Sequence, residues 1–230
     1  ADDDVATFTG GVDATSATGT VTLAGAINTV DTAMDFGNVT LADGTTFDTG
    51  NAAAGTIVVG DITTGTNEVS FDSGSTAGAT IDVGAIADLT GGLTLVDAGG
   101  LATFGALGQG TTGDITVTDS SAGVTFGGAV TATTLTLTDT TAGEDITFQG
   151  DLVATTLTST ATSAYDVQFD ENVTITNDVD FGAIGTLTIG TADDDVATFT
   201  GGVDATSATG TVTLAGAINT VDTAMDFGNV

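Results

Sequence analysis

Residues 131–139 read TATTLTLTD, and apolar and polar side chains alternate along most of this stretch. Alternation with a period of two is the pattern of a β-strand that buries one of its faces. The same rhythm recurs in GTVTLAG, GDITVTD, NVTIT and GTLTIG. Thr, Val, Ile and Phe favour pleated surfaces, and the Gly, Asp, Asn and Ser clusters between these runs are typical of turns. The sequence therefore predicts an all-β fold of many short strands.

A longer period is set by large apolar anchors. An anchor is an aromatic or aliphatic residue followed by small or polar residues and then by another aliphatic, as in Phe36-Gly-Asn-Val39. Most successive anchors are 21–24 residues apart, with one step of 30, and they are Phe36, Val59, Val83, Phe104, Phe126, Phe148, Phe169 and Phe199. A unit of this length suits one rung of a β-solenoid, whose stacked rungs bury a shared axial core. We expect a right-handed parallel β-solenoid (β-helix) of about 22–24 residues per rung, with these anchors inward.

Two further features suit stacked rungs. A second anchor often follows 11 or 12 residues after the first, as Phe47 follows Phe36 and Phe71 follows Val59. The Gly after many anchors would let the backbone turn a tight corner. The chain has no Pro, which agrees with strands that all donate hydrogen bonds to their neighbours.

The first 39 residues, ADDDVATFTGGVDATSATGTVTLAGAINTVDTAMDFGNV, return without a difference at residues 192–230. The offset is 191 residues, or about eight rungs. We therefore divide the chain into one full solenoid repeat, residues 1–191, and the start of the next identical repeat, residues 192–230, with no linker. A tandem array predicts such an overlap, and an engineered circular overlap is the alternative. Neither end shows a polar cap, so we expect a segment of a longer array or subunits that join head to tail.

A row of β-sandwich domains is the competing fold. A sandwich needs ~90–100 residues with hairpin turns around one dominant core, and two would fit into one repeat. However, Asp43-Gly44 is the only clear hairpin signal, and both Trp and Pro are absent. The solenoid is therefore the favoured interpretation.

The composition excludes several classes of function. The chain has 230 residues, 31 acidic groups and no Lys, Arg, His or Cys, which gives a net charge of −31. Without cations, the chain has nothing to neutralise phosphates or anionic lipid, so we expect no nucleic-acid partner. No apolar run approaches the ~18 residues of a membrane helix, and no signal peptide is recognisable, so we expect no membrane insertion.

The carboxylates suggest a divalent cation. With a strand spacing of ~4.8 Å, one repeat would be roughly 38 Å long and carry about one charge per 1.5 Å, similar to duplex DNA. Ca²⁺ prefers carboxylate and carbonyl oxygens, so it could bind such a rod or bridge two of them. Each acidic cluster also suits a solvated turn, and none matches a known calcium-loop pattern. The candidate calcium ligands are Asp2, Asp3, Asp4, Asp193, Asp194, Asp195, Asp170, Glu171, Asp178 and Asp180.

Catalysis has few residue types to draw on. The chain has no His for a triad and no Lys or Cys nucleophile, so we expect no enzyme. A pair of carboxylates could still hydrolyse a glycoside, as in a tailspike-like glycan hydrolase, which is one alternative. The other alternative is an ice- or glycan-binding adhesin that uses stacked Thr-x-Thr pairs on a flat face. These pairs occur at 116/118, 134/136/138, 156/158, 174/176 and 186/188.

Residues 124–160, VTFGGAVTATTLTLTDTTAGEDITFQGDLVATTLTST, resemble the giant bacterial surface proteins built from β-strand repeats. Those proteins look like relatives of filamentous-haemagglutinin and autotransporter-type adhesins. The resemblance covers nearly the whole chain and rests on pattern and composition. It implies a structural filament at the bacterial cell surface, outside the cell, that serves attachment or matrix architecture. Its expected partners are other copies of itself, with surface glycans as candidate ligands.

Overall fold

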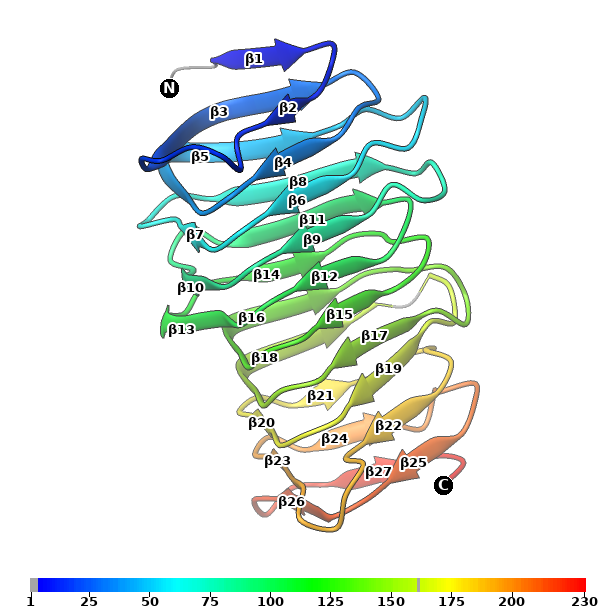
Figure 1. Cartoon of the computed structure of the whole chain (residues 1–230). Helices are drawn as coiled ribbons and strands as arrows, with labels where there is room; N and C mark the ends of the chain where they lie inside the picture. The colour runs from blue at the N-terminus through cyan, green and yellow to red at the C-terminus, as the bar shows by residue number, and fades with distance from the viewer. Residues whose placement is uncertain (1–3, 161) are drawn as a thin grey trace.

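The computed structural model describes residues 4–160 and 162–230, and these residues wind into a β-solenoid of about ten turns (Figure 1). Each turn has about 22 residues, and no helix occurs in the described part of the chain. The strand pairings are parallel, and each strand pairs with the strand one turn away. The predicted parallel solenoid is confirmed. The sandwich alternative is wrong, because a sandwich would pair its strands in antiparallel hairpins.

Each turn has three faces, which we call the first, second and third face in the order in which the chain visits them. The second face is one 10-stranded sheet. Its strands are β2 (Val12–Asp13), β4 (Met34–Phe36), β6 (Ile57–Val59), β9 (Ile81–Val83), β12 (Ala102–Phe104), β15 (Val124–Phe126), β17 (Asp145–Phe148), β19 (Asp166–Phe169), β22 (Leu187–Ile189) and β25 (Val212–Leu214).

The third face follows the corner after each of these strands. It is formed by β7 (Ile62–Thr63), β10 (Ile86–Asp88), β13 (Leu107–Thr111), β20 (Val173–Ile175), β23 (Val196–Phe199) and β26 (Ala217–Thr220). Four longer strands begin on the third face and continue around the next corner onto the first. They are β3 (Val21–Thr29), β5 (Val39–Asp48), β16 (Val130–Leu137) and β18 (Leu152–Ser159).

The first face combines the second halves of those long strands with shorter ones. The shorter strands are β1 (Val5–Phe8), β8 (Val69–Gly74), β11 (Leu93–Ala98), β14 (Ile115–Val117), β21 (Val179–Asp180), β24 (Val203–Ala205) and β27 (Met225–Phe227). β21 lies beneath the second half of β18: the Asn177 side chain donates to Thr156 Oγ1 at 2.8 Å, and Gly182 lies against the Ser159 carbonyl. The three-stranded sheet β21-β24-β27 therefore continues the first face.

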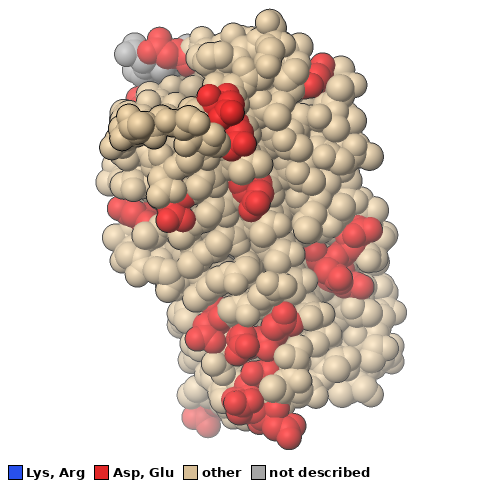
Figure 2. All heavy atoms as spheres, in the orientation of Figure 1, with Lys and Arg blue, Asp and Glu red and all other residues tan. Residues whose placement is uncertain are grey.

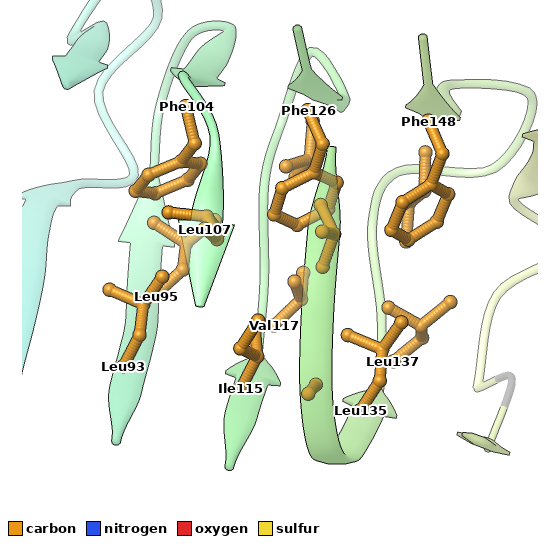
Figure 3. Packing of buried hydrophobic residues seen from close by; sticks show 14 of the residues in the cluster. Leu93, Leu95, Phe104, Leu107, Ile115, Val117, Phe126, Leu135, Leu137 and Phe148 are labelled. Carbon is orange, nitrogen blue, oxygen red and sulfur yellow. The ribbon is translucent and has the colours of Figure 1, made fainter. Parts of the chain in front are cut away.

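The core is built by equal positions stacked in successive turns. On the second face the strand register aligns Phe104, Phe126 and Phe148, and each is at most 1% exposed. Figure 3 shows these rings side by side, with the aliphatic side chains of the first face opposite them. Neighbouring Phe rings run along the axis at centroid distances of 4.7–6.2 Å, through Phe36, Phe47, Phe71, Phe104, Phe126, Phe148, Phe169 and Phe181. Each buried Phe contributes about 1.5–3 kcal/mol, and each ring pair about 0.5–1.5 kcal/mol more.

All eight predicted anchors are buried, but one of them lies in a different column. Seven anchors, from Phe36 to Phe169, stack on the second face. The position below Phe169 is filled by Ile189, which is followed by Leu214. Phe199 instead pairs with Ile175 on the third face. The 30-residue step from Phe169 to Phe199 is therefore more than one turn, because a smaller aliphatic fills the anchor position between them.

The corner after the second face requires glycine for close contact between turns. A Cβ atom on Gly84 would lie 2.8 Å from the backbone of Gly60 in the previous turn, and one on Gly105 would lie 2.8 Å from that of Gly84. Contacts below 3.0 Å between such atoms force the backbone to shift. The predicted corner role of these glycines is thus confirmed, and its physical reason is the close approach of stacked corners.

Candidate functional site

The most regular surface feature is a line of hydroxyl groups on the first face. Strand register places these side chains above one another in six consecutive turns, each pointing away from the core and between two inward positions. Adjacent members are separated by the strand spacing of ~4.8 Å. We call this set the hydroxyl column, and its members are Thr46, Ser70, Thr94, Thr116, Thr136 and Thr158.

The hydroxyl column widens into a small grid in its last turns. Thr134 and Thr156 are register partners beside it. Thr138 follows on the other side, where its N–H donates to the Val117 carbonyl at 2.9 Å. The predicted Thr-x-Thr pairs at 116/118, 134/136/138 and 156/158 therefore share one face. The pairs at 174/176 and 186/188 do not join them, because Thr174 lies on the third face and Thr188 on the second.

A line of carboxylates borders the hydroxyl column, and we call it the acidic ladder. Asp48 pairs with Asp72, and Asp72 with Asp97, in successive turns. Burial raises the pKa of Asp72, and the charge of Asp48 adds to this effect. Burial also raises the pKa of Asp97, with further contributions from the charges of Asp119 and Asp72. The stacked carboxylates therefore repel one another along the axis.

Sequence reasoning did not find the acidic ladder, although a signal was available. Asp48, Asp72, Asp97 and Asp119 are 24, 25 and 22 residues apart, which is the same spacing as the anchors. Asp97 Oδ1 is buried and has no hydrogen-bond partner among the described residues. By contrast, Asp48 accepts from the Gly50 N–H at 2.7 Å and Asp72 from the Gly74 N–H at 2.9 Å.

The candidate calcium ligands of the DDD clusters are spread over loops. Asp2 and Asp3 lie outside the described residues, and Asp4 is exposed. In the second copy, Asp193 and Asp194 are exposed. Asp195 is only 6% exposed, and its carboxylate accepts from the backbone N–H groups of residues 191 and 192 at 2.6 and 2.7 Å. Its visible role is to hold its own turn.

The remaining four candidates lie on two separate corners. Asp170 accepts from the Gln168 side chain at 2.6 Å, and the neighbouring Glu171 is exposed. Asp178 is exposed, and Asp180 accepts from the Gly182 N–H at 2.8 Å. Within residues 4–160 and 162–230, no three acidic side chains come close enough together to hold a metal ion.

Polar groups inside the rod are held by hydrogen bonds at the corner after the first face. Ser73 and Ser120 are fully buried, and their hydroxyls donate to the carbonyls of Ala79 and Gly123, each at 2.7 Å. The hydroxyl of Tyr165 donates to the Leu137 carbonyl at 3.1 Å and lies 3.0 Å from Ser159 Oγ. Burial raises the pKa of Tyr165. These groups satisfy one another and so support the fold.

The surface is hollowed at two shallow places near the first turns. One hollow is lined by uncharged residues around Thr20, Asn38 and Thr63, and the other contains Asp13 and Asp35. Neither contains a member of the acidic ladder. Figure 2 shows separate acidic patches down the visible side and no basic side chain. The geometry therefore offers repeated hydroxyls and carboxylates along a rod.

These features define the chain as a parallel β-solenoid with an acidic, hydroxyl-rich surface. No protein-family model, no curated protein and no solved structure matches the chain. Among the described residues there is no helix of a length and hydropathy that could cross a membrane.

Proposed function

We propose that the protein is a structural filament of the cell exterior, built from tandem copies of a 191-residue solenoid unit. The observation that carries this proposal is the behaviour of the repeated segment. Residues 196–199 pair with β20 above them and with β26 below them. The second copy thus continues the same stack without a break, and a unit that stacks on its own copy can extend indefinitely.

The mechanical properties of a filament follow from this stacking. Backbone hydrogen bonds run from turn to turn along the axis, so that pulling on the rod loads many of them together. The aliphatic and Phe core is continuous through the described turns. Trypsin has no cleavage site, because the chain contains neither Lys nor Arg. A long rod of this kind would be stiff and resistant to proteases.

The partners of such a filament are other copies of itself. A net charge of −31 with no cation keeps neighbouring rods apart at low salt. Divalent cations such as Ca²⁺ could bridge carboxylates of two rods, and lateral bundling would then depend on them. This bridging needs no closed metal site within one chain.

Electron microscopy of the native material tests the proposal. We expect uniform thin fibres without globular subunits. Compact particles of the mass of one chain would contradict a filament role. Addition of EDTA to bundled fibres separates the role of Ca²⁺: loss of bundles with intact single fibres is expected, whereas unchanged bundles would exclude cation bridging.

The hydroxyl column favours a second candidate, which is binding of ice or a glycan through the first face. Six turns of outward Thr and Ser at a constant strand spacing form a template for an ordered ligand. Thr136→Tyr would disrupt the column, and Thr174→Tyr on the third face is the matched control. If the column binds ice, inhibition of ice recrystallisation is lost in the first variant and kept in the second. No inhibition by the unaltered chain removes ice as the ligand.

A further inference from the structure

The two identical segments of the chain occupy different faces of the solenoid. In the first copy, β1 pairs with the second half of β3, which belongs to the first face. In the second copy, the same four letters form β23, which pairs with β20 and β26 on the third face. Identical sequence has therefore been placed in two different columns of the same stack.

The next two elements of the segment are displaced in the same way. β2 lies in the 10-stranded sheet of the second face, whereas its copy β24 lies in the three-stranded sheet that continues the first face. Residues 21–23 of β3 lie on the third face, whereas their copy β25 lies on the second. All three elements have moved by one face, so the displacement is a rotation of the whole segment.

The local structure of the segment is the same in both positions. Val5 pairs with Ala26, and their copies Val196 and Ala217 pair again. The pairing of residues 12 and 34 recurs at 203 and 225. Asp13 accepts from the Thr15 N–H and hydroxyl at 3.0 and 2.7 Å, and the copies of these residues, 204 and 206, repeat the contact at 2.8 and 2.7 Å.

Even the unusual backbone positions are retained. Asp31 has a φ of 54° and its copy Asp222 has a φ of 55°. Gly25 and its copy Gly216 have φ values of 71° and 70°. Left-handed backbone at a residue other than glycine is uncommon, so its recurrence shows that the segment folds alike on either set of faces. The three faces are interchangeable for this sequence.

The number of turns in one repeat explains the rotation. Eight turns separate Val12 in β2 from Leu187 in β22, which is on the same face. The chain then visits the third face in β23 and the first face in β24, where the copy of Val12 lies at Val203. One repeat of 191 residues is therefore eight and two-thirds turns.

From this geometry we propose that successive units in a tandem array are turned by one face, so that the filament has threefold screw symmetry apart from any twist of the solenoid itself. This inference rests on the proposed filament function. With a strand spacing of ~4.8 Å, each unit advances about 42 Å along the axis, and a surface feature returns to the same side after three units, or about 125 Å.

The consequence concerns how a filament presents its surface. The hydroxyl column and the acidic ladder lie on the first face of one unit, on the third face of the next and on the second face of the one after. Each feature is thus displayed on three sides at about 42 Å intervals, and a partner that recognises it can dock from any direction. Lateral contacts between copies would then build round bundles with three equivalent directions, not flat ribbons.

Engineered disulfides in the full 230-residue chain test the rotation, and the chain has no Cys that could interfere. Register partners in neighbouring parallel strands lie ~4.8 Å apart, within the ~4.4–6.8 Å range of Cα separations in disulfides. The test pair is Thr174→Cys with Thr198→Cys, which joins β20 to β23. Asp180→Cys with Asp204→Cys is a positive control on the first face. The opposing pair is Asp180→Cys with Thr198→Cys.

We expect both thiols of the test pair and of the positive control to disappear on mild oxidation, while the opposing pair stays reduced. If the second copy kept the face of the first, Thr198 would lie below β21, so the opposing pair would close and the test pair would not. A folded chain in which the test pair stays reduced overturns the inference. This readout is independent of filament formation: a compact native particle with a closed test pair would refute the filament and leave the rotation in place.

Discussion

The two copies of the repeated segment have one sequence but different burial. Phe8 is 39% exposed in the first copy, where β1 has a neighbouring strand on one side only, whereas its copy Phe199 is fully buried between β20 and β26. The order reverses further along: Met34 is fully buried, and its copy Met225 is 39% exposed. Burial in this fold is therefore decided by the turns above and below, so stability should be close to a sum of nearest-neighbour terms.

A charge in the middle of the stack should have the largest effect. Phe126 lies between Phe104 and Phe148 with no exposed surface. Phe126→Asp removes this packing and buries an unpaired carboxylate, so we expect a loss of at least about 4 kcal/mol in the free energy of unfolding. Urea denaturation followed by circular dichroism measures it. Thr125→Asp points outward in the same strand, and its expected change is within about 0.5 kcal/mol. Equal losses in the two variants would contradict the stacked core.

The comparison between the two copies can be tested with identical substitutions. Phe199→Ala should cost about 3–5 kcal/mol, because it opens a cavity between two turns. Phe8→Ala should cost less than about 1 kcal/mol, because its ring is already partly in water and is covered on one side only. Denaturation midpoints of the two variants give the difference. If both substitutions cost the same, burial does not depend on neighbouring turns and the nearest-neighbour account fails.

The stacked corners provide a test of intermediate size. Gly84→Ala places a Cβ 2.8 Å from the backbone of the preceding corner, so we expect a loss of about 1–3 kcal/mol. Gly10→Ala is the matched control, because nothing lies within 4 Å of its added Cβ and its φ is not positive. Thermal unfolding distinguishes the two. Tolerance of alanine at position 84 would show that the corners are not in close contact.

The smallest expected effect concerns pH. Burial and mutual repulsion raise the folded-state pKa of Asp72 and Asp97 above the ordinary 3.8, so the folded chain binds these protons more tightly than the unfolded chain. Stability should therefore rise as pH falls from neutrality towards these raised values. The hydrogen bond from Thr111 lowers the pKa of Asp88, as do those from Thr90, so the stability from this group is lost only on further acidification.

Asp97→Asn tests this assignment. It should raise the free energy of unfolding by about 0.5 kcal/mol at about pH 7, and the gain should vanish at about pH 3, where the carboxyl is protonated. Melting temperatures of both chains across this range provide the measurement. A gain that is independent of pH would assign the effect to packing instead of charge. Asp43→Asn, at an exposed turn, is the control with no expected change.

Most of the fold could be predicted from the sequence, because burial in a solenoid repeats at a spacing that can be read directly. The anchors from Phe36 to Phe169 form one column as expected. Phe199 was assigned to the wrong column, because Ile189 fills the anchor position with a smaller side chain that looks like an ordinary strand residue. The rotation between copies could not be predicted either, because it depends on the fraction of a turn in each repeat.

The surface was harder to predict than the core. Hydroxyls at 116, 136 and 158 share a column only because the lengths of the intervening loops keep the register, and sequence spacing alone gave no constant phase. The acidic ladder was hidden because its members do not cluster along the chain. The DDD clusters are dense in sequence, yet in the second copy they lie on a loop where Asp195 binds its own backbone.

X-ray diffraction from aligned specimens of the protein tests the central claim most directly. The account predicts a strong reflection at about 4.8 Å on the meridian, because the strands lie across the axis and stack along it. A reflection at that spacing on the equator, or none along the axis, would contradict turns of about 22 residues stacked on one another.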